Sequence, residues 1–221
     1  MPENQHNHDA LDTMRHSAAH VMAKAVQRLY PGARLAIGPT IEHGFYYDID
    51  VPETISEDDL PRIEDEMRRI VAAGEPFERI EMTRDDAIRH YREVEPNPLK
   101  VEVLEGIDDP KVSFYKTGPD WLDLCRGPHV RSTREIGAFK LTSVAGAYWR
   151  GDERNPMLQR IYGTAWPTEE ELQEYLHRIE EAQRRDHRRL GRELDLYLTH
   201  ELVGQGLPML TPKGAVVRRL L

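Results

Sequence analysis

Residues 12–32, DTMRHSAAHVMAKAVQRLYPG, decide how the chain folds. The Asp12-Thr13 pair can cap the start of a helix, and Pro31-Gly32 ends it. At about 100° per residue, His16 and His20 lie nearly opposite the apolar side of that helix. The apolar side is a stripe at helical spacing made of Met14, Ala18, Val21, Met22, Ala25 and Leu29. The stretch therefore predicts a helix that packs along one side and turns two imidazoles toward something else.

A second pair of candidate site residues, Cys125 and His129, stands more than 100 residues further along, in CRGPH. Cys125 is the only cysteine, so it has no disulfide partner within the chain. A lone cysteine beside histidines is a candidate for metal ligation or catalysis. Gly127 and Pro128 prevent a regular helix here, but a bent loop can still aim both side chains at one point.

Together, His16, His20, Cys125 and His129 would form a group of three histidines and one cysteine. Alternatively, two histidines four residues apart are an ordinary helix surface, and a buried cysteine is more often inert than reactive. With four protein ligands a tetrahedral zinc would be closed and therefore structural. Without metal, the histidines would position and activate a water molecule as general bases. Metal-dependent and metal-free hydrolysis both stay open on these residues alone.

Two charged residues lie where they could join the group. Asp123 precedes Cys125 by two positions, so on a strand both side chains would face the same side. Its alternative is a solvent-facing carboxylate. Lys100 follows the rigid Pro98 turn and begins an expected strand, Lys100–Leu104. Its alternative is an ordinary surface lysine.

The rest of the chain predicts an α+β fold, a mostly antiparallel sheet packed with helices and followed by a long linker helix. Ser56 with Asp59 forms a capping box for a helix that Gly74 closes. A similar box, Thr168 with Glu171, opens the long helix. Residues 1–12 read as a disordered tail. Further expected elements are a hairpin of Arg34–Ile37 and Gly44–Ile49, a short helix at Asp85–Tyr91, and strands at Ser113–Lys116, Trp121–Leu124, Gly137–Ala145 and Leu158–Trp166.

Composition narrows the class of protein. Hydrophobic residues make up 39% and charged residues 31%, a globular profile. No apolar run approaches the roughly 18 residues that a membrane helix needs, and the N-terminal residues lack the pattern of a signal peptide. With a single cysteine, this points to the cytoplasm.

Charge is unevenly distributed along the chain. A net charge of −9 argues against a non-specific nucleic-acid binder. However, six arginines between Arg178 and Arg192, including Arg184 and Arg188, form a local basic stretch that could bind phosphates. The alternative is a solvated helix with Glu/Arg pairs at helical spacing.

Read together, these segments resemble threonyl-tRNA synthetases from about Met14 onward. The matching segments are RHSAAH (15–20), AIGPTIEHGFYYDID (36–50), DLCRGPHV (123–130), AGAYWRGDERNPMLQRIYGTAW (145–166) and RRDHRRLGRELDLY (184–197). The two His and Cys/His pairs are also shared with the alanyl-tRNA editing family, where they hold zinc. From Ala145 onward the segments are similar to the threonyl type.

This resemblance implies an editing domain at 13–166, a linker helix at 167–194, and the truncated start of a class II synthetase catalytic core at 195–221. It implies hydrolysis of serine wrongly attached to threonine tRNA. The implied pocket holds His16, His20, Cys125 and His129, with Lys100 and Asp123 beside them. Separately, we expect the arginines of the linker helix, including Arg184 and Arg188, to meet the tRNA backbone or a neighbouring domain.

The resemblance implies an editing reaction that needs no cofactor and works through positioned water, although zinc in the His/His/Cys/His group is possible. ATP, magnesium and a catalytic-core zinc belong only to a full-length ligase. The implied partner is the acceptor end of tRNA(Thr) carrying serine, with no membrane. The full-length ligase is expected to be a homodimer and this chain a monomer. Two alternatives are a zinc-stabilised tRNA-binding module without catalysis, and an inert fragment that needs missing parts to receive tRNA.

Overall fold

The computed structural model describes residues 3–204 and 206–221, and contacts divide the chain into two compact units, Met1–Leu172 and Gln173–Leu221. The first unit contains, in chain order, α1 (Glu3–Leu29), β1 (Arg34–Leu35), β2 (Thr40–Ile41), β3 (Gly44–Asp50), α2 (Leu60–Ala73), β4 (Phe77–Thr83), α3 (Arg84–Arg89), a π-helical turn (His90–Val94), α4 (Pro98–Glu105), β5 (Lys111–Thr117), β6 (Trp121–Leu124), β7 (Ala138–Tyr148) and β8 (Met157–Trp166). Then follow α5 (Glu169–Arg184), α6 (His187–Glu193), β9 (Tyr197–Thr199), β10 (Pro208–Leu210) and α7 (Pro212–Leu220).

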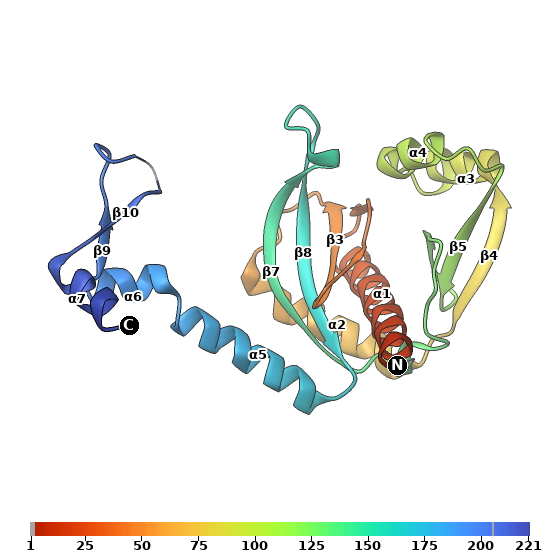
Figure 1. The fold of residues 1–221 in the computed structure, drawn as a ribbon. Helices are drawn as coiled ribbons and strands as arrows, with labels where there is room; N and C mark the ends of the chain where they lie inside the picture. Colours follow the sequence, from red (N-terminus) through yellow and green to blue (C-terminus); the bar gives the residue numbers. More distant parts are fainter. Residues whose placement is uncertain (1–2, 205) are drawn as a thin grey trace. The chain divides into compact units, whose positions relative to one another are not determined.

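The first unit has a larger lobe built on a five-stranded antiparallel sheet in the order β1-β3-β8-β7, with β2 paired to β3 (Figure 1). Helix α1 packs against β3 and β8, and α2 packs against α1 and β7. Within α1, every residue from Met14 to Val26 is buried except His16, which is half-buried. The helix is therefore covered on nearly all sides, more than a single apolar stripe predicts.

A smaller lobe of the same unit is a three-stranded antiparallel sheet, β4-β5-β6 (Figure 1). Helices α3 and α4 and the π-helical turn supply its core together with β5. The buried core residues are Ala87, Tyr91, Val101, Leu104, Val112 and Phe114. No strand is predicted from the sequence at the position of β4, whose side chains are mostly exposed.

The expected α+β class and antiparallel pairing are confirmed, as are the two capping boxes and the helix end at Gly74. The predicted helix start at Asp12-Thr13 is wrong, because α1 begins at Glu3. Ser56 and Asp59 form the capping box, and Gly74 ends α2 in the left-handed region at φ 70°. Thr168 and Glu171 exchange the two hydrogen bonds of the second box at 3.2 and 3.3 Å. These local signals work because each satisfies backbone groups that a helix end leaves without partners.

The expected strand Lys100–Leu104 is wrong, because these residues belong to α4. The Asn97 side chain accepts hydrogen bonds from the backbone N–H groups of Leu99 and Lys100, and Pro98 occupies the first turn. Both are helix-start signals. The β-branched Val101 and Val103 favour a strand by propensity. Packing overrides that preference, because Val101 lies in the core of the smaller lobe and Val103 packs against a separate apolar cluster that includes Leu99 and Trp149.

Two further expectations are corrected. The disordered tail expected over residues 1–12 is helical from Glu3 onward, while residues 1–2 lie outside the described residues. The stretch 3–12 has no proline or glycine, and Leu11 packs against the main core. The expected single linker helix to Leu194 is two helices, α5 and α6. Asp186 separates them, because its side chain caps α6 by accepting from the backbone N–H groups of Arg188 and Arg189.

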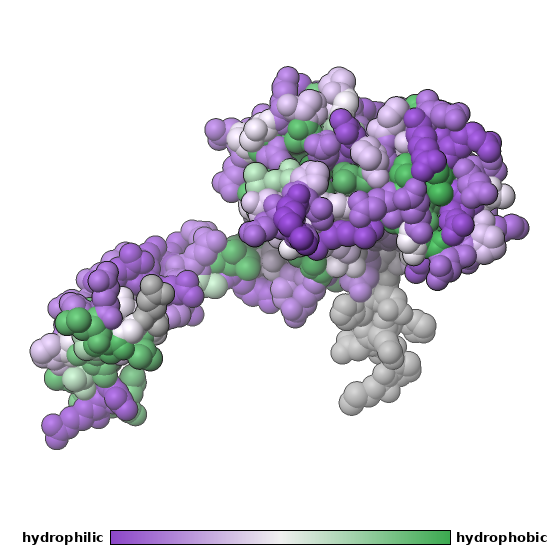
Figure 2. Space-filling model, turned by 90° about the horizontal axis from the view of Figure 1, so that it is seen from above, coloured by the Kyte–Doolittle hydropathy of each residue, from purple (hydrophilic) through white to green (hydrophobic). Residues whose placement is uncertain are grey.

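The second unit joins α6 and α7 to the β9–β10 hairpin. It leaves large apolar side chains exposed, and this apolar surface is visible in Figure 2. The exposed side chains include Leu198, Leu202, Leu207, Leu220 and Leu221. Across residues 3–204 and 206–221, no helix combines the length and apolar character needed to cross a bilayer.

Candidate functional site

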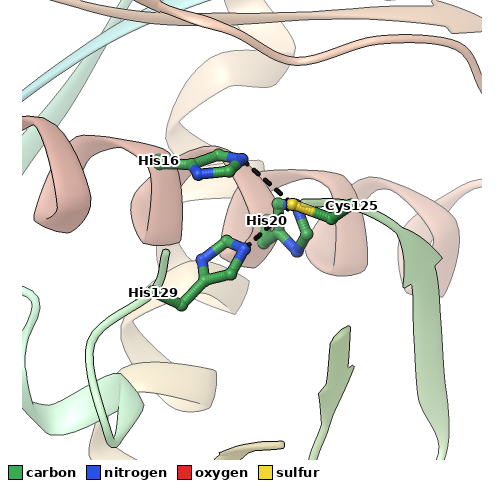
Figure 3. A group of neighbouring side chains, drawn as sticks. All are labelled: His16, His20, Cys125 and His129. Atoms are coloured by element: carbon green, nitrogen blue, oxygen red, sulfur yellow. Dashed lines mark hydrogen bonds between the residues drawn. The ribbon is translucent and has the colours of Figure 1, made fainter. Parts of the chain in front are cut away.

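The structure brings the two distant pairs of site residues together. His16 and His20 project from α1 toward the loop after β6, which carries Cys125 and His129 (Figure 3). One ligand atom from each of the four lies within 4.8 Å of the others. The spacing of four residues on α1 aligns the two imidazoles on one side of the helix, as the sequence predicts.

Cys125 lies between two of the imidazoles. Its Sγ is 3.3 Å from Nε2 of His16 and 3.3 Å from Nε2 of His129. The backbone N–H of Gly127 donates to the same sulfur at 3.2 Å. A thiol carries one hydrogen, so it can donate to only one of the two Nε2 atoms at a time. The centre of the group is therefore rich in lone pairs.

Aromatic side chains pack against two of the imidazoles in this group of four residues. The ring of Phe77 stacks on His129 at a centroid distance of 4.9 Å, and Tyr115 meets the same imidazole edge-on at 4.4 Å. Trp121 meets His20 edge-on at 5.3 Å. These contacts exclude water from two of the three imidazoles and fix their ring planes.

Burial keeps all four groups uncharged near neutral pH. Desolvation lowers the pKa of His129 to about 2, with a further lowering by His16, and lowers the pKa of His20 well below its usual value. Desolvation also lowers the pKa of His16, but its hydrogen bond to Pro128 and the Asp123 charge oppose that effect. The pKa of the Cys125 thiol rises to about 11, mainly through burial. His16 is thus the imidazole best able to accept a proton.

The donor set fits a zinc ion. Ligands about 2.0–2.3 Å from a tetrahedral zinc lie roughly 3.3–3.8 Å from one another, and the two sulfur–nitrogen distances of 3.3 Å match that range. Nδ1 of His16 donates to the Pro128 carbonyl at 3.2 Å, as ligand histidines commonly do. Nδ1 of His20 is buried without a hydrogen-bond partner among the described residues. Four protein ligands would leave no open position, so such a zinc would be structural.

Lys100 and Asp123 lie beside this group as a buried ion pair. The Lys100 ammonium is 2.6 Å from the Asp123 carboxylate. Their charges reach the group, since Asp123 acts on His16 and Lys100 on His20. The surface-lysine and solvent-facing alternatives are therefore wrong, because both side chains are buried.

Two tyrosines that the sequence analysis missed complete the ion pair. Tyr47, on β3, donates its hydroxyl to Asp123 and approaches the Lys100 ammonium at 3.4 Å. Tyr91, in the π-helical turn, lies 3.4 Å from Asp123 and accepts a hydrogen bond from the backbone N–H of Leu124. The only sequence signal was the position of Tyr47 in GFYYDID, where alternation places it on the buried face of a strand.

A cavity of about 770 Å³ opens beside Cys125 on the smaller lobe. Its volume falls in the range of about 300–1,000 Å³ that small-molecule sites occupy. Three cations line it, Arg79, Lys111 and Arg126, together with the carboxylates Glu81 and Asp109. The wall at Cys125 is shared with the imidazole group.

Arg184 and Arg188 lie in the second unit, Gln173–Leu221. Arg184 is exposed and pairs with Glu180 at 3.0 Å and Glu181 at 2.9 Å. The Glu/Arg pairing at helical spacing that the sequence allowed is thus confirmed for α5. A contact of either arginine with tRNA stays a prediction.

Comparison with known proteins connects this architecture to translation. The profile of the threonyl and alanyl tRNA synthetase second additional domain matches residues 112–162, which include Asp123, Cys125 and His129. Among curated proteins, the threonine–tRNA ligase of Rubrobacter xylanophilus is 57% identical over 214 residues, 96% of this chain and 33% of the ligase. The ligase of Anoxybacillus flavithermus is 55% identical (96% and 33%), and that of Gloeobacter violaceus is 56% identical over 220 residues (98% and 35%).

The profile match identifies residues 112–162 as part of an additional domain of the kind that threonyl- and alanyl-tRNA synthetases share. The three threonine–tRNA ligases are each more than 50% identical to this chain along nearly its whole length, which favours the threonyl over the alanyl type. The chain belongs to the threonyl-tRNA synthetase family. It spans about a third of the length of these curated relatives.

Proposed function

We propose that the chain is the proofreading module of a threonine–tRNA ligase and hydrolyses serine from Ser-tRNA(Thr). The observation that carries this proposal is the convergence of His16, His20, Cys125 and His129 on one point beside a cavity. The proposed setting is the cytoplasm, within a homodimeric ligase whose aminoacylation core supplies its own ATP, magnesium and zinc chemistry. Residues 195–221 would be the start of that core.

The need for such a module follows from the size of serine. Serine lacks one methyl group of threonine, a difference worth only about 1–3 kcal/mol in a binding pocket. A synthetic site cannot reject the smaller amino acid by that margin. A second pocket that admits serine and sterically excludes threonine multiplies the discrimination.

The chemistry is cleavage of an ester by water. The water oxygen attacks the ester carbonyl carbon while Nε2 of His16 takes a proton from the water. The bond to the ribose oxygen then breaks, and that oxygen leaves with a proton as a free hydroxyl of the tRNA. Serine departs with the carboxylate. We assign the base role to His16 because the pKa values of His20 and His129 are lowered further by their surroundings.

The other residues position the reactants. His20 and His129, as neutral imidazoles, accept or donate hydrogen bonds to the water and the seryl group. Cys125 acts as a thiol and not as a nucleophile, because its pKa of about 11 leaves little thiolate at neutral pH. Lys100 and Asp123 form a fixed charged wall. A zinc held by His16, His20, Cys125 and His129 would supply a fixed positive charge that stabilises the fold.

The terminal nucleotide of the tRNA would occupy the cavity beside Cys125. Arg79, Lys111 and Arg126 suit it because phosphate oxygens attract guanidinium and ammonium groups. We propose that Arg184 and Arg188 add contacts to the tRNA backbone. Reversing both charges should then weaken tRNA binding at low salt; unchanged binding would leave them as a solvated helix face.

The deciding experiment measures release of amino acid from Ser-tRNA(Thr) and Thr-tRNA(Thr), with and without a chelator. We expect release of serine only, and a loss of about 10²–10⁴-fold in rate for His16→Ala. His43→Ala, which removes an exposed imidazole of the same unit, is the matched control and should keep full activity. Equal hydrolysis of both substrates would overturn the selectivity.

Two other results favour other functions. Metal release and unfolding by the chelator, with tRNA binding but no hydrolysis in the untreated protein, would indicate a zinc-stabilised tRNA-binding module. That outcome has support from the zinc-like donor set. Binding of a seryl-adenosine mimic without hydrolysis of the tRNA would indicate an inert fragment that needs the rest of the ligase.

A further inference from the structure

Ser17 is a buried α1 residue adjacent to His16 in the sequence, and the ester hydrolysis does not use it directly. Its Oγ makes three polar contacts. It donates to the carbonyl of Thr13 at 2.8 Å, accepts from the backbone N–H of Val130 at 3.1 Å, and lies 3.0 Å from Nδ1 of His129. The hydroxyl thus joins α1 to the loop that carries His129.

Counting hydrogens settles the direction of the third contact. A serine hydroxyl has one hydrogen and two acceptor lone pairs. The Thr13 carbonyl can only accept, so it takes the hydrogen, and the Val130 N–H can only donate, so it takes one lone pair. The remaining lone pair faces Nδ1 of His129, which must therefore carry a hydrogen. In the neutral imidazole, Nε2 is then the unprotonated nitrogen.

His16 has the same Nδ1–H tautomer, but a backbone carbonyl fixes it instead of a serine. Its Nδ1 faces the carbonyl of Pro128, an acceptor only, so Nδ1 carries the hydrogen here as well. The loop backbone thus fixes the tautomer of the helix histidine, and the helix serine fixes the tautomer of the loop histidine. Both Nε2 lone pairs point at Cys125 Sγ, 3.3 Å away in each case.

We propose that Ser17 is a positioning residue, which locks His129 in the Nδ1–H tautomer so that its Nε2 presents a lone pair to the reacting centre. The catalytic part of this inference rests on the proposed hydrolysis. With the other tautomer, an Nε2–H would point at the thiol and at any water held there. That water would lose an acceptor that orients its hydrogens, while binding of the tRNA would be unaffected.

The test combines NMR of the histidine ring nitrogens with kinetics. In ¹⁵N-histidine protein, assigned by loss of signals in His129→Asn, we expect a protonated Nδ1 and an unprotonated Nε2 for His129. Ser17→Ala should shift His129 toward the Nε2–H form and lower kcat for Ser-tRNA(Thr) about 10–100-fold with KM unchanged. Ser17→Thr, which keeps a hydroxyl able to reach the i−4 carbonyl, should restore the tautomer.

Thr133→Val is the matched control, because it also deletes a buried hydroxyl that accepts from one N–H, that of Glu75, and donates to a helix carbonyl, that of Ile70. It should change neither the tautomer nor kcat. A protonated Nε2 in the wild-type protein overturns the proposal, even where Ser17→Ala fails to fold. An unchanged tautomer in folded Ser17→Ala also overturns it. If NMR shows the expected tautomers but the protein does not hydrolyse Ser-tRNA(Thr), the proposed function is overturned. The inference that Ser17 fixes the tautomer of His129 is then still supported.

Discussion

The Lys100 ammonium and the Asp123 carboxylate lie 2.6 Å apart, and their side chains are only 4% and 2% exposed. Lys100 comes from α4 and Asp123 from β6, both in the smaller lobe. Tyr47 of the larger lobe donates to the same carboxylate. The ion pair therefore connects the two lobes at the edge of the imidazole–thiol group, and it holds charge where water is largely excluded.

Breaking this pair should destabilise the protein strongly. Lys100→Met leaves the Asp123 carboxylate buried with only hydroxyl and amide partners, which should lower the free energy of unfolding by about 3–5 kcal/mol in urea titrations. Arg154→Met is the matched control, because its 2.6 Å pair with Asp152 is exposed to solvent and should contribute little to stability. Equal effects of the two variants would contradict the assigned burial of the Lys100 pair.

Lys24 and Arg28 lie one helical turn apart on α1, and Lys24 should stabilise the fold more than Arg28 does. Lys24 is buried and donates to Glu75, Asp120 and the carbonyl of Thr117 at 2.7–2.8 Å. Lys24→Met leaves these acceptors without their donor, so we expect a loss of about 1–3 kcal/mol in the free energy of unfolding.

Arg28 is the matched control for Lys24, since it contacts the same carboxylates but is 36% exposed. Arg28→Met should cost less than about 1 kcal/mol. In an NMR titration, Lys24→Met should also raise the pKa of Asp120 from about 2, because the Lys24 hydrogen bond is the main cause of its lowering. A larger loss in the free energy of unfolding for Arg28→Met than for Lys24→Met would show that Arg28, and not Lys24, is the more stabilising cation.

Sequence patterns predicted the parts of the site that depend on local geometry. The i, i+4 spacing of His16 and His20 requires only a helix, and the break at Gly127-Pro128 requires only a loop. Both features depend on backbone periodicity, which the sequence carries directly. The meeting of the two pairs was a hypothesis that periodicity could not establish, because it depends on how β6 is placed against α1.

Contacts between distant elements were not predictable in the same way. Nothing near Lys100 in the sequence signals that its partner is Asp123, or that Tyr47 completes the pair. The break at Pro98 also suits a strand start, although Asn97-Pro98 carries the signal of a helix start, and the structure has the helix. Ser17 drew no attention because a serine within a helix has no pattern of its own, and its importance comes from the His129 loop.

The protonation state of Cys125 gives a chemical prediction. Burial raises the pKa of this thiol to about 11, so little thiolate exists at neutral pH. Alkylation by iodoacetamide should be slow at pH 7, and its rate should rise up to about pH 11. Acid quenching during hydrolysis of Ser-tRNA(Thr) should trap no seryl thioester. Fast alkylation at pH 7, or a trapped acyl-enzyme, would make Cys125 a nucleophile and remove water from the proposed first step.

Acid should unfold the protein partly through its buried histidines. The pKa of His129 is about 2 in the folded state, mainly through burial, against about 6.5 in an unfolded chain. Between these values the unfolded state binds a proton that the folded state does not, so stability rises with pH and is fully present above about pH 6.5. Each pH unit below that costs up to about 1.4 kcal/mol, and His20 acts in the same direction.

Urea unfolding at pH 7.5 and 5.5 measures this loss. His129→Asn should reduce the difference between the two pH values by about 1 kcal/mol, because asparagine does not titrate. If His129→Asn retains the full acid loss, folding does not lower the pKa of His129, and burial of a neutral imidazole is not a cause of the acid sensitivity.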